Sequence, residues 1–461
     1  MKVISGLHAR LGDFWWWSIC LFVALRIGDV INAVVGLWLV PKYVGQEELG
    51  AVLPLLQVSS VFGLPISILV LVFMKFLNRY KTNGEDGKVK SLMRTFWLLA
   101  SACIVLGCFA AAFLLPHFFD RIRVVSGSLG ILIMASAVLS STSPVFSNAL
   151  QALKRFRSIA ALNFLSAPLR LVVMLVAMPF RALSGYMLGQ IAPSVLHIGW
   201  SIVALRKDLG RAITTDSSWR HDIPAMIRYT ICVALWMGAA TIVAMIQAMI
   251  IRQRLPEVES AAYYMISRFA ELATYAGLTL STVMFPFAAE AHTRGKDSAR
   301  LLHRMTIATI GFGLLCAGGL AIFGRFIFEL SPLWSAYVGY VPDMVLLALV
   351  LTLGMAVGNF CSHQAARDDF SFLWFVVPLS AAQAAFYICF TGYGFFNGIL
   401  PQSVVDWMGS LHIASLRNIL WTMCAFTVFN TIGAALVCWS GSNNTSHANP
   451  QGGKQRDHNQ N

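Results

Sequence analysis

Charged residues are scarce in this chain, and their scarcity excludes most soluble proteins. Only 12% of the 461 residues are charged, whereas 57% are hydrophobic and the mean hydropathy is +0.68. This composition is typical of polytopic membrane proteins. The chain also lacks segments of about ten residues that alternate apolar and polar side chains, the pattern of a membrane β-barrel. The sequence therefore predicts an all-α protein with many membrane-spanning helices.

Motifs for nucleotide, metal or catalytic chemistry are missing as well. No GxxxxGK[ST] segment occurs, and the longest predicted cytoplasmic loop, about 20 residues, is too short for a nucleotide-binding domain. The nine cysteines form no CxxC pair and no histidine cluster of metal-ligand spacing, so no metal site is predicted. No soluble domain offers a surface for nucleic acid. No external loop holds the acidic motif of a glycosyltransferase or polymerase, so we expect no catalytic residues and no enzyme.

Apolar segments long enough to cross a bilayer recur along the chain. A spanning helix needs about 20 predominantly apolar residues, and twelve such segments lie near 14–40, 51–74, 95–116, 124–152, 159–180, 183–205, 225–251, 260–288, 304–327, 339–362, 371–395 and 416–439. The most polar internal stretch predicts one six-helix lobe over 1–205, a cytoplasmic linker over 206–224 and a second six-helix lobe over 225–440. Two lobes of equal orientation predict a central cleft. Residues 441–461 lack apolar periodicity, and we expect a disordered tail.

Lysine and arginine are distributed unequally between the two sides of the predicted membrane. With the N-terminus inside, the cytoplasmic loops hold roughly three times as many of them as the external loops, the bias that sets topology. Both termini are therefore predicted to be cytoplasmic, and the bias accounts for most of the net charge of +13. Basic groups such as KRFR at 154–157 act as topology determinants or meet anionic lipid head groups.

Five charged residues lie inside the predicted spans, away from the span ends. Arg26 and Asp29 in the first span, and Arg268 and Glu271 in the eighth, are each three residues apart and share a helix face. Arg170 lies near mid-depth in the fifth span. One interpretation is that the pairs neutralise themselves and lock helix packing; the other is that they mark a substrate or ion pathway. Three arginines against two carboxylates suit an anionic substrate such as a diphosphate, because the guanidinium fork matches phosphate.

We predict a cationic cavity in which the three arginines bind substrate and the two carboxylates act in ion pairing or coupling. Uncharged polar residues within the spans are predicted to line it, namely Gln57, Asn148 and Gln247. Intramembrane polar side chains most often hydrogen-bond to neighbouring helices. That alternative stays open for each of them.

The segment 25–58, LRIGDVINAVVGLWLVPKYVGQEELGAVLPLLQV, resembles the opening of flippases in the multidrug/oligosaccharidyl-lipid/polysaccharide (MOP) exporter superfamily. In that family a P-x-Y-x-G-x-E-x-x-G type turn joins the first two spans, matched here by Pro41, Tyr43, Gly45, Glu47 and Gly50. The segment 261–304, which begins AAYYMISRFAELAT, resembles the family's eighth span. The chain departs from the family at 396–414, a longer external loop that could form an interfacial amphipathic turn.

The resemblance implies a flippase that moves an isoprenoid-diphosphate-linked oligosaccharide, a unit of O-antigen, capsule or exopolysaccharide, to the external leaflet by alternating access. It implies a bacterial inner-membrane location, no cofactor beyond a coupling ion such as H⁺ or Na⁺, and polysaccharide polymerase and chain-length proteins as partners. Flippases of this family carry cavity-facing arginines in the first and eighth spans, where Arg26 and Arg268 fall. The alternatives are a lipid II flippase and a cation-coupled multidrug exporter, which is expected to have a more acidic cavity.

Overall fold

The computed structural model describes residues 19–23, 26–122, 155–210, 218–294, 298–390 and 415–445, with isolated positions at 16, between 132 and 153, and at 403. Every regular element in these ranges is a helix. Within the described residues, eight helices are long and apolar enough to cross a membrane, and a bent pair of shorter helices can form a ninth span. The prediction of an all-α polytopic membrane protein is therefore confirmed. Most of the predicted fourth span, and all of the 396–414 loop except residue 403, lie outside the described residues.

The described part of the N-terminal half, up to residue 210, consists mainly of long helices. In chain order they are the first span (Ile19–Tyr43), which contains the π-helical turn η1 (Val35–Leu39) and α2 (Val40–Tyr43), then α3 (Gln46–Thr82), α4 (Asp86–Ile122), α6 (Phe156–Ala177) and α7 (Ala182–Gly210). α7 continues past residue 205, where the first lobe was predicted to end.

The C-terminal half begins at residue 218 and contains more short elements. In chain order they are η2 (Ser218–Asp222), α8 (Ile223–Arg254), α9 (Glu257–Ala270), η3 (Glu271–Thr274), α10 (Tyr275–Thr293), α11 (Ala299–Glu329), α12 (Pro332–Ser335), η4 (Val338–Tyr340), α13 (Val341–Ala366), α14 (Leu373–Phe390) and α16 (Leu416–Thr445). α16 extends past residue 440, where the second lobe was predicted to end. The predicted 206–224 linker is helical at both ends.

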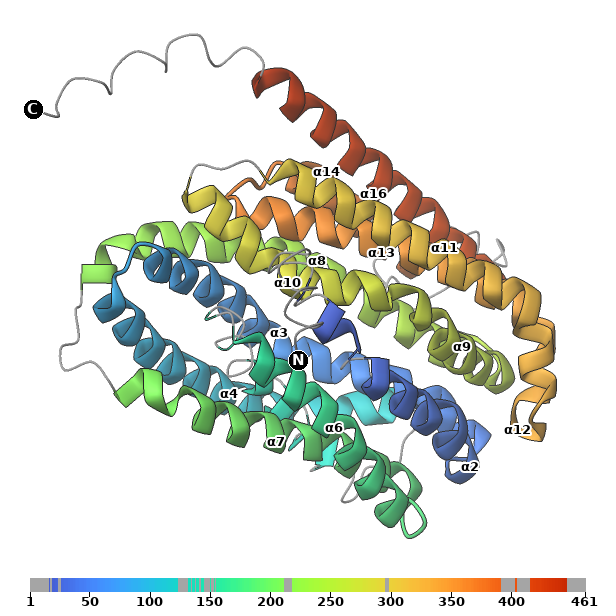
Figure 1. Cartoon of the computed structure of the whole chain (residues 1–461). Coiled ribbons are helices and arrows are strands. Elements are labelled where there is room, and N and C mark those ends of the chain that lie inside the picture. Colours follow the sequence, from blue (N-terminus) through green and yellow to red (C-terminus); the bar gives the residue numbers. More distant parts are fainter. Residues whose placement is uncertain are drawn as a thin grey trace, which may run out of the picture.

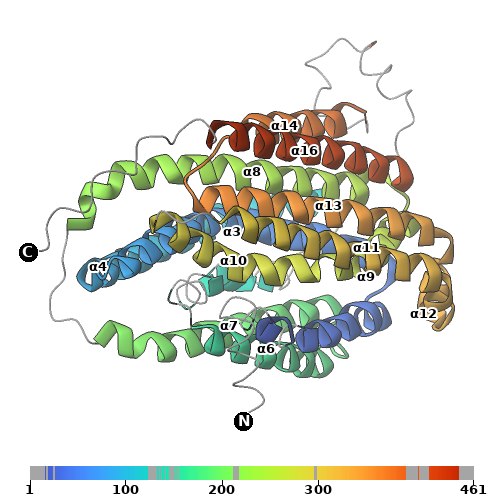
Figure 2. The same ribbon diagram turned by 45° about the horizontal axis from the view of Figure 1, so that its top comes forward.

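The long helices run side by side, as Figures 1 and 2 show. α6 and α7 lie at one side of the molecule, and α14 and α16 lie at the opposite side, with α3 between them. α3 packs against α8, α9 and α10, so one helix of the N-terminal half contacts three helices of the C-terminal half. Large apolar side chains cover the outer surface: Trp374 is 88% exposed and Phe180 84%. Such a surface is expected to face lipid.

The first span contains a π-helical turn near its end. Pro41 explains why two carbonyl groups of this turn accept hydrogen bonds from side chains of the other half. Within η1 the N–H of Val40 bonds to the carbonyl of Val35, five residues earlier. Proline has no N–H, so Pro41 cannot donate to the Leu37 carbonyl in α-helical register or to the Gly36 carbonyl in π-helical register. Side chains from the C-terminal half donate instead. The Tyr264 hydroxyl lies 3.2 Å from the Gly36 oxygen, and Trp334 Nε1 lies 2.6 Å from the Leu37 oxygen.

The predicted eighth span is not one continuous helix. It is split into α9, the 3₁₀ turn η3 and α10, and its two parts are bent by 50° relative to each other. The predicted pair Arg268 and Glu271 lies at this break. Broken helices inside membrane proteins are tolerated where they are buried in protein or line a cavity.

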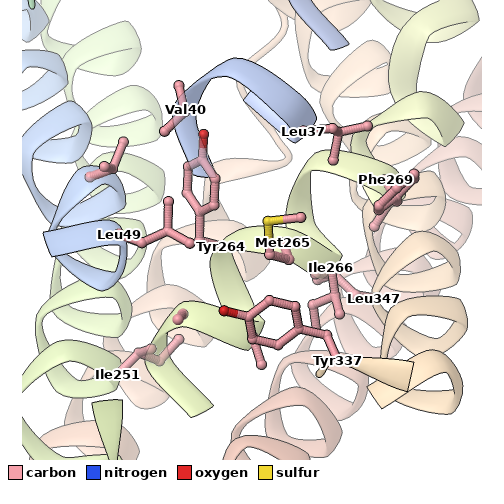
Figure 3. Packing of buried hydrophobic residues seen from close by; sticks show 14 of the residues in the cluster. Leu37, Val40, Leu49, Ile251, Tyr264, Met265, Ile266, Phe269, Tyr337 and Leu347 are labelled. Atoms are coloured by element: carbon pink, nitrogen blue, oxygen red, sulfur yellow. The ribbon is translucent and has the colours of Figure 1, made fainter. Parts of the chain in front are cut away.

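Buried apolar residues form two main clusters, and each contains residues of both halves. The external cluster, named from the predicted topology, includes Leu37, Val40, Leu49, Ile251, Tyr264, Met265, Phe269, Tyr337 and Leu347 (Figure 3). The cytoplasmic cluster includes Phe73, Leu77, Tyr80, Phe96, Tyr229, Met284 and Ala288. Apolar side chains of both halves are therefore present in the clusters at both ends of the contact.

Candidate functional site

Arg26, Asp29 and Arg170 lie between these two clusters along their helices, whereas Arg268 and Glu271 lie within the external cluster, near its inner end. Along the first span, the cytoplasmic cluster includes Leu21 and the external cluster begins at Val35. Along the broken eighth span, the external cluster ends at Ala273 and the cytoplasmic cluster begins at Leu280. Both spans therefore carry charged side chains near the boundary between the two apolar clusters, and they form a polar layer at the mid-depth predicted from the sequence.

Arg26 and Asp29 form the ion pair that their spacing predicts. Arg26 Nη2 lies 2.7 Å from Asp29 Oδ2, and both side chains are about one-fifth exposed. The same Nη2 atom lies 3.3 Å from the backbone oxygen of Tyr275, at the start of α10. The guanidinium also lies over the rings of Tyr275, at 4.1 Å, and Phe22, at 4.9 Å. Arg26 thus joins the first span to the break in the eighth.

Arg268 and Glu271 form a second pair of the same spacing. Arg268 Nη1 lies 3.1 Å from Glu271 Oε2, and the guanidinium lies 5.3 Å from the centre of the Tyr264 ring. The stem of Arg268 passes close to the first span, where a Cβ atom on Gly36 would lie 3.4 Å from Arg268 Cδ. The glycine in the π-helical turn therefore leaves room for this arginine.

Arg170 on α6 belongs to the same layer. Its Nη1 atom donates to Asn32 Oδ1 at 3.2 Å. Arg170 also interacts electrostatically with Glu271, and Glu271 in turn interacts with Asp29. The structure therefore brings all five predicted ionisable residues into one connected group, which we call the mid-depth cluster: Arg26, Asp29, Arg170, Arg268 and Glu271.

Several arginine N–H groups of the mid-depth cluster are buried without a hydrogen-bond acceptor among the described residues. They are Nε and Nη1 of Arg26, Nε of Arg170 and Nε of Arg268. A buried donor without a partner costs about 1–3 kcal/mol, and more when it is charged. Donors of this kind fit an acceptor-rich ligand, and phosphate oxygens are the acceptors that arginine matches best.

The predicted uncharged residues of the cavity lie in different places. Gln247 on α8 is buried and donates through Nε2 to the Tyr263 hydroxyl at 2.9 Å and to Met423 Sδ at 2.8 Å. Tyr263 interacts with Arg268 and Glu271, so Gln247 is one residue removed from the cluster. Gln57 is half-buried on α3. Asn148 lies outside the described residues.

Sequence reasoning missed the residues that support the arginines, namely Phe22, Asn32, Tyr264 and Tyr275. Helical spacing is a signal that could have found them. Phe22 and Tyr264 precede Arg26 and Arg268 by four residues, the distance at which helix side chains meet. No group of His, Cys, Asp and Glu side chains able to hold a metal ion occurs in the part of the chain that the structure describes.

Solved structures similar to the whole chain identify its fold, although sequence comparison does not. No family model and no curated sequence matches the chain. A mutant of the MATE transporter VcmN from Vibrio cholerae matches 96% of this chain over 99% of its own, with 14% identity and a TM-score of 0.66. A MATE protein in the straight conformation matches 96% of this chain over 98% of its own, with 12% identity and a TM-score of 0.68.

The chain has the MATE fold. A MOP superfamily transporter from Pyrococcus furiosus shares it, with 14% identity, a TM-score of 0.66 and coverage of 96% of this chain and 98% of its own. At these identities the likeness establishes the MATE fold alone.

Proposed function

We propose that the chain is a flippase that moves an isoprenoid-diphosphate-linked oligosaccharide from the cytoplasmic to the external leaflet by alternating access. The observation that carries the proposal is the set of buried N–H donors on Arg26, Arg170 and Arg268 for which the described residues offer no acceptor. A diphosphate presents several charged oxygens, so it can accept from more than one of these arginines at once.

The charge balance of the cluster supports an anionic rather than a cationic substrate. Asp29 and Glu271 each pair with one arginine, and Arg170 is held by the neutral amide of Asn32. One positive charge is therefore left over. We propose that a diphosphate takes up this charge, while the lipid tail stays in the bilayer and the glycan lies between the two halves.

The MATE fold is compatible with pockets of different charge. The P. furiosus transporter is described as having a binding pocket of reverse polarity that suggests a different function. We extend the proposal to a bacterial inner-membrane protein with both termini cytoplasmic, no catalytic reaction of its own, H⁺ or Na⁺ as coupling ion, and a polysaccharide polymerase and chain-length proteins as partners. A lipid II flippase would use the same diphosphate chemistry and differ only in the glycan.

The second candidate is a cation-coupled multidrug exporter. It is favoured by the carboxylates of Asp29 and Glu271, which interact with each other inside the cluster and could hold a cation. The VcmN neighbour is described as a MATE transporter. The two candidates differ in the sign of the ligand charge, so ligand binding separates them.

The test is binding of three probes to the purified protein in lipid nanodiscs, measured by native mass spectrometry. We expect farnesyl diphosphate to bind more tightly than farnesyl monophosphate, and tetraphenylphosphonium to bind weakly. Arg26→Gln and Arg268→Gln should each weaken diphosphate binding about tenfold or more, because a hydrogen bond to a charged group contributes about 1.5–3 kcal/mol.

Arg325→Gln is the matched control. Arg325 also pairs with a glutamate of its own helix, Glu329, at 2.9 Å, but it is 79% exposed. The control should bind farnesyl diphosphate as the unmodified protein does. The flippase would be rejected, and the exporter favoured, if tetraphenylphosphonium binds more tightly than farnesyl diphosphate and this binding is lost in Asp29→Asn but kept in Arg26→Gln.

A further inference from the structure

The last turns of α3 enter the C-terminal half at the predicted cytoplasmic end. Lys75 and Asn78 are only 6% and 4% exposed. Asn78 Nδ2 donates to the backbone oxygen of Pro286 on α10 at 2.8 Å. The Tyr80 hydroxyl lies 2.5 Å from Asp222 Oδ2, immediately before α8. Asn78 and Tyr80 therefore contact the other half.

Lys75 is the charged member of this group, and it interacts electrostatically with Arg79 and His292 as well as with Asp368. Its ammonium lies 4.6 Å from the centre of the Tyr229 ring on α8 and forms an ion pair with Asp368, between α13 and α14. The Lys75 side chain is 7% exposed, whereas that of Asp368 is 56% exposed. The pair therefore reaches from the buried contact between the halves to the surface.

The backbone of the α13–α14 turn fixes the position of Asp368. Asp368 has φ of 64°, the only positive value at a non-glycine residue in the described ranges. This left-handed conformation is costly for most residues, although aspartate and asparagine tolerate it. The turn is braced by Asp369, which accepts from Gln364 Nε2 at 3.1 Å and from the Ser371 N–H at 3.0 Å. Asp368 is thus held where Lys75 can reach it.

Separating the halves would affect the Asp368 carboxylate and the Lys75 ammonium differently. Asp368 is already solvated, but the Lys75 ammonium would lose both its ion pair and the ring face of Tyr229. A buried charge that loses its partner before water reaches it is left uncompensated, and this is costly. Lys75 therefore resists opening until water reaches it.

We infer that Lys75 and Asp368 form a latch between the two halves that keeps the predicted cytoplasmic end closed. The latch opens each time the mid-depth cluster is exposed to that side. It rests on the proposed function only in requiring that the halves move apart, and it does not depend on the substrate.

The test measures the distance between the halves by double electron–electron resonance, without substrate. Spin labels are placed at Asn83→Cys, after α3, and Arg294→Cys, after α10, in a protein whose nine native cysteines are replaced. Both label positions are exposed. The starting protein should give mainly one short distance. Lys75→Met and Asp368→Asn should each raise the population of a longer distance about tenfold, which corresponds to about 1.4 kcal/mol.

Two further variants serve as controls. Lys75→Arg should keep the short distance, and it also shows that the position tolerates substitution. Asp86→Asn removes a carboxylate from an exposed pair with Lys81 that lies within the N-terminal half, at 2.8 Å, and it should leave the distances unchanged.

The latch is rejected if neither Lys75→Met nor Asp368→Asn lengthens the distance, or if Asp86→Asn lengthens it equally. Asp368→Asn keeps the side-chain shape and tolerates the turn, so it decides the question even if Lys75→Met fails to fold. If the unmodified protein does not bind farnesyl diphosphate but Lys75→Met and Asp368→Asn still lengthen the distance, the flippase is rejected and the latch is supported.

Discussion

Tyr264 and Tyr80 close opposite ends of the contact between the two halves with different chemistry. Each is 1% exposed and donates its hydroxyl across the contact. At the predicted external end, Tyr264 donates to the backbone carbonyl of Gly36, and Trp334 donates to that of Leu37. At the predicted cytoplasmic end, Tyr80 donates to the carboxylate of Asp222, beside the ion pair of Lys75.

The difference teaches how each end resists opening. A neutral hydrogen bond contributes about 0.5–1.5 kcal/mol net, because water can replace it. The external end must therefore depend on apolar packing around its neutral bonds. Hydrogen bonds to charged groups contribute about 1.5–3 kcal/mol, so the cytoplasmic end depends more on charge.

The largest expected effect comes from the packing of the external cluster. Phe328 is fully buried and lies 5.1 Å from Phe269, which in turn lies 5.9 Å from Trp334. Phe328→Ala should lower the free energy of unfolding by about 3–5 kcal/mol, because it leaves a cavity. The measurement is thermal unfolding in nanodiscs. Phe326→Ala on the same helix, 61% exposed, is the control; an equal loss in both variants would refute the role of packing.

The next largest effect is expected at the cytoplasmic end. Tyr80→Phe removes a hydrogen bond to a carboxylate and should lower the free energy of unfolding by about 1.5–3 kcal/mol. Asp222→Asn keeps an acceptor for the hydroxyl and should cost less. Thermal unfolding of both variants under identical conditions checks the order, and a greater loss in Asp222→Asn would contradict it.

The smallest effect is expected for the neutral bonds of the external end. Tyr264→Phe should cost about 1 kcal/mol, the contribution of a neutral hydrogen bond, and therefore less than Tyr80→Phe. In a Pro41→Ala background the cost should shrink further, since residue 41 can then donate to a carbonyl of the first span. The comparison between the two ends fails if Tyr264→Phe and Tyr80→Phe destabilise the protein equally in thermal unfolding.

The helical class and the two ion pairs were predictable because both depend on local sequence. Apolar segments of bilayer length predict spans, and spacing of three residues predicts the pairs Arg26–Asp29 and Arg268–Glu271. Both pairs form in the structure. Their role in binding stays a prediction.

The distortions of the spans and the joining of the arginines were not predictable in the same way. Hydropathy is an average over a segment and carries no information about which carbonyl accepts a hydrogen bond from each N–H. Neither the π-helical turn nor the break at Glu271 was therefore predicted. Contacts such as Arg170 with Asn32, or Arg26 with Tyr275, join residues far apart in the chain. They depend on tertiary packing, which no spacing rule supplies.

The π-helical turn at Val35–Leu39 acts like a one-residue insertion in the first span. One residue corresponds to about 100° of rotation in an α-helix, so the turn changes the phase between the parts of the helix before and after it. Deleting one residue there would restore regular winding, yet it would turn Arg26 and Asp29 away from the face on which Tyr275 lies. The direction in which Arg26 and Asp29 face therefore depends on a turn about ten residues further along the chain. Gly36 and Pro41 permit the irregular winding of that turn.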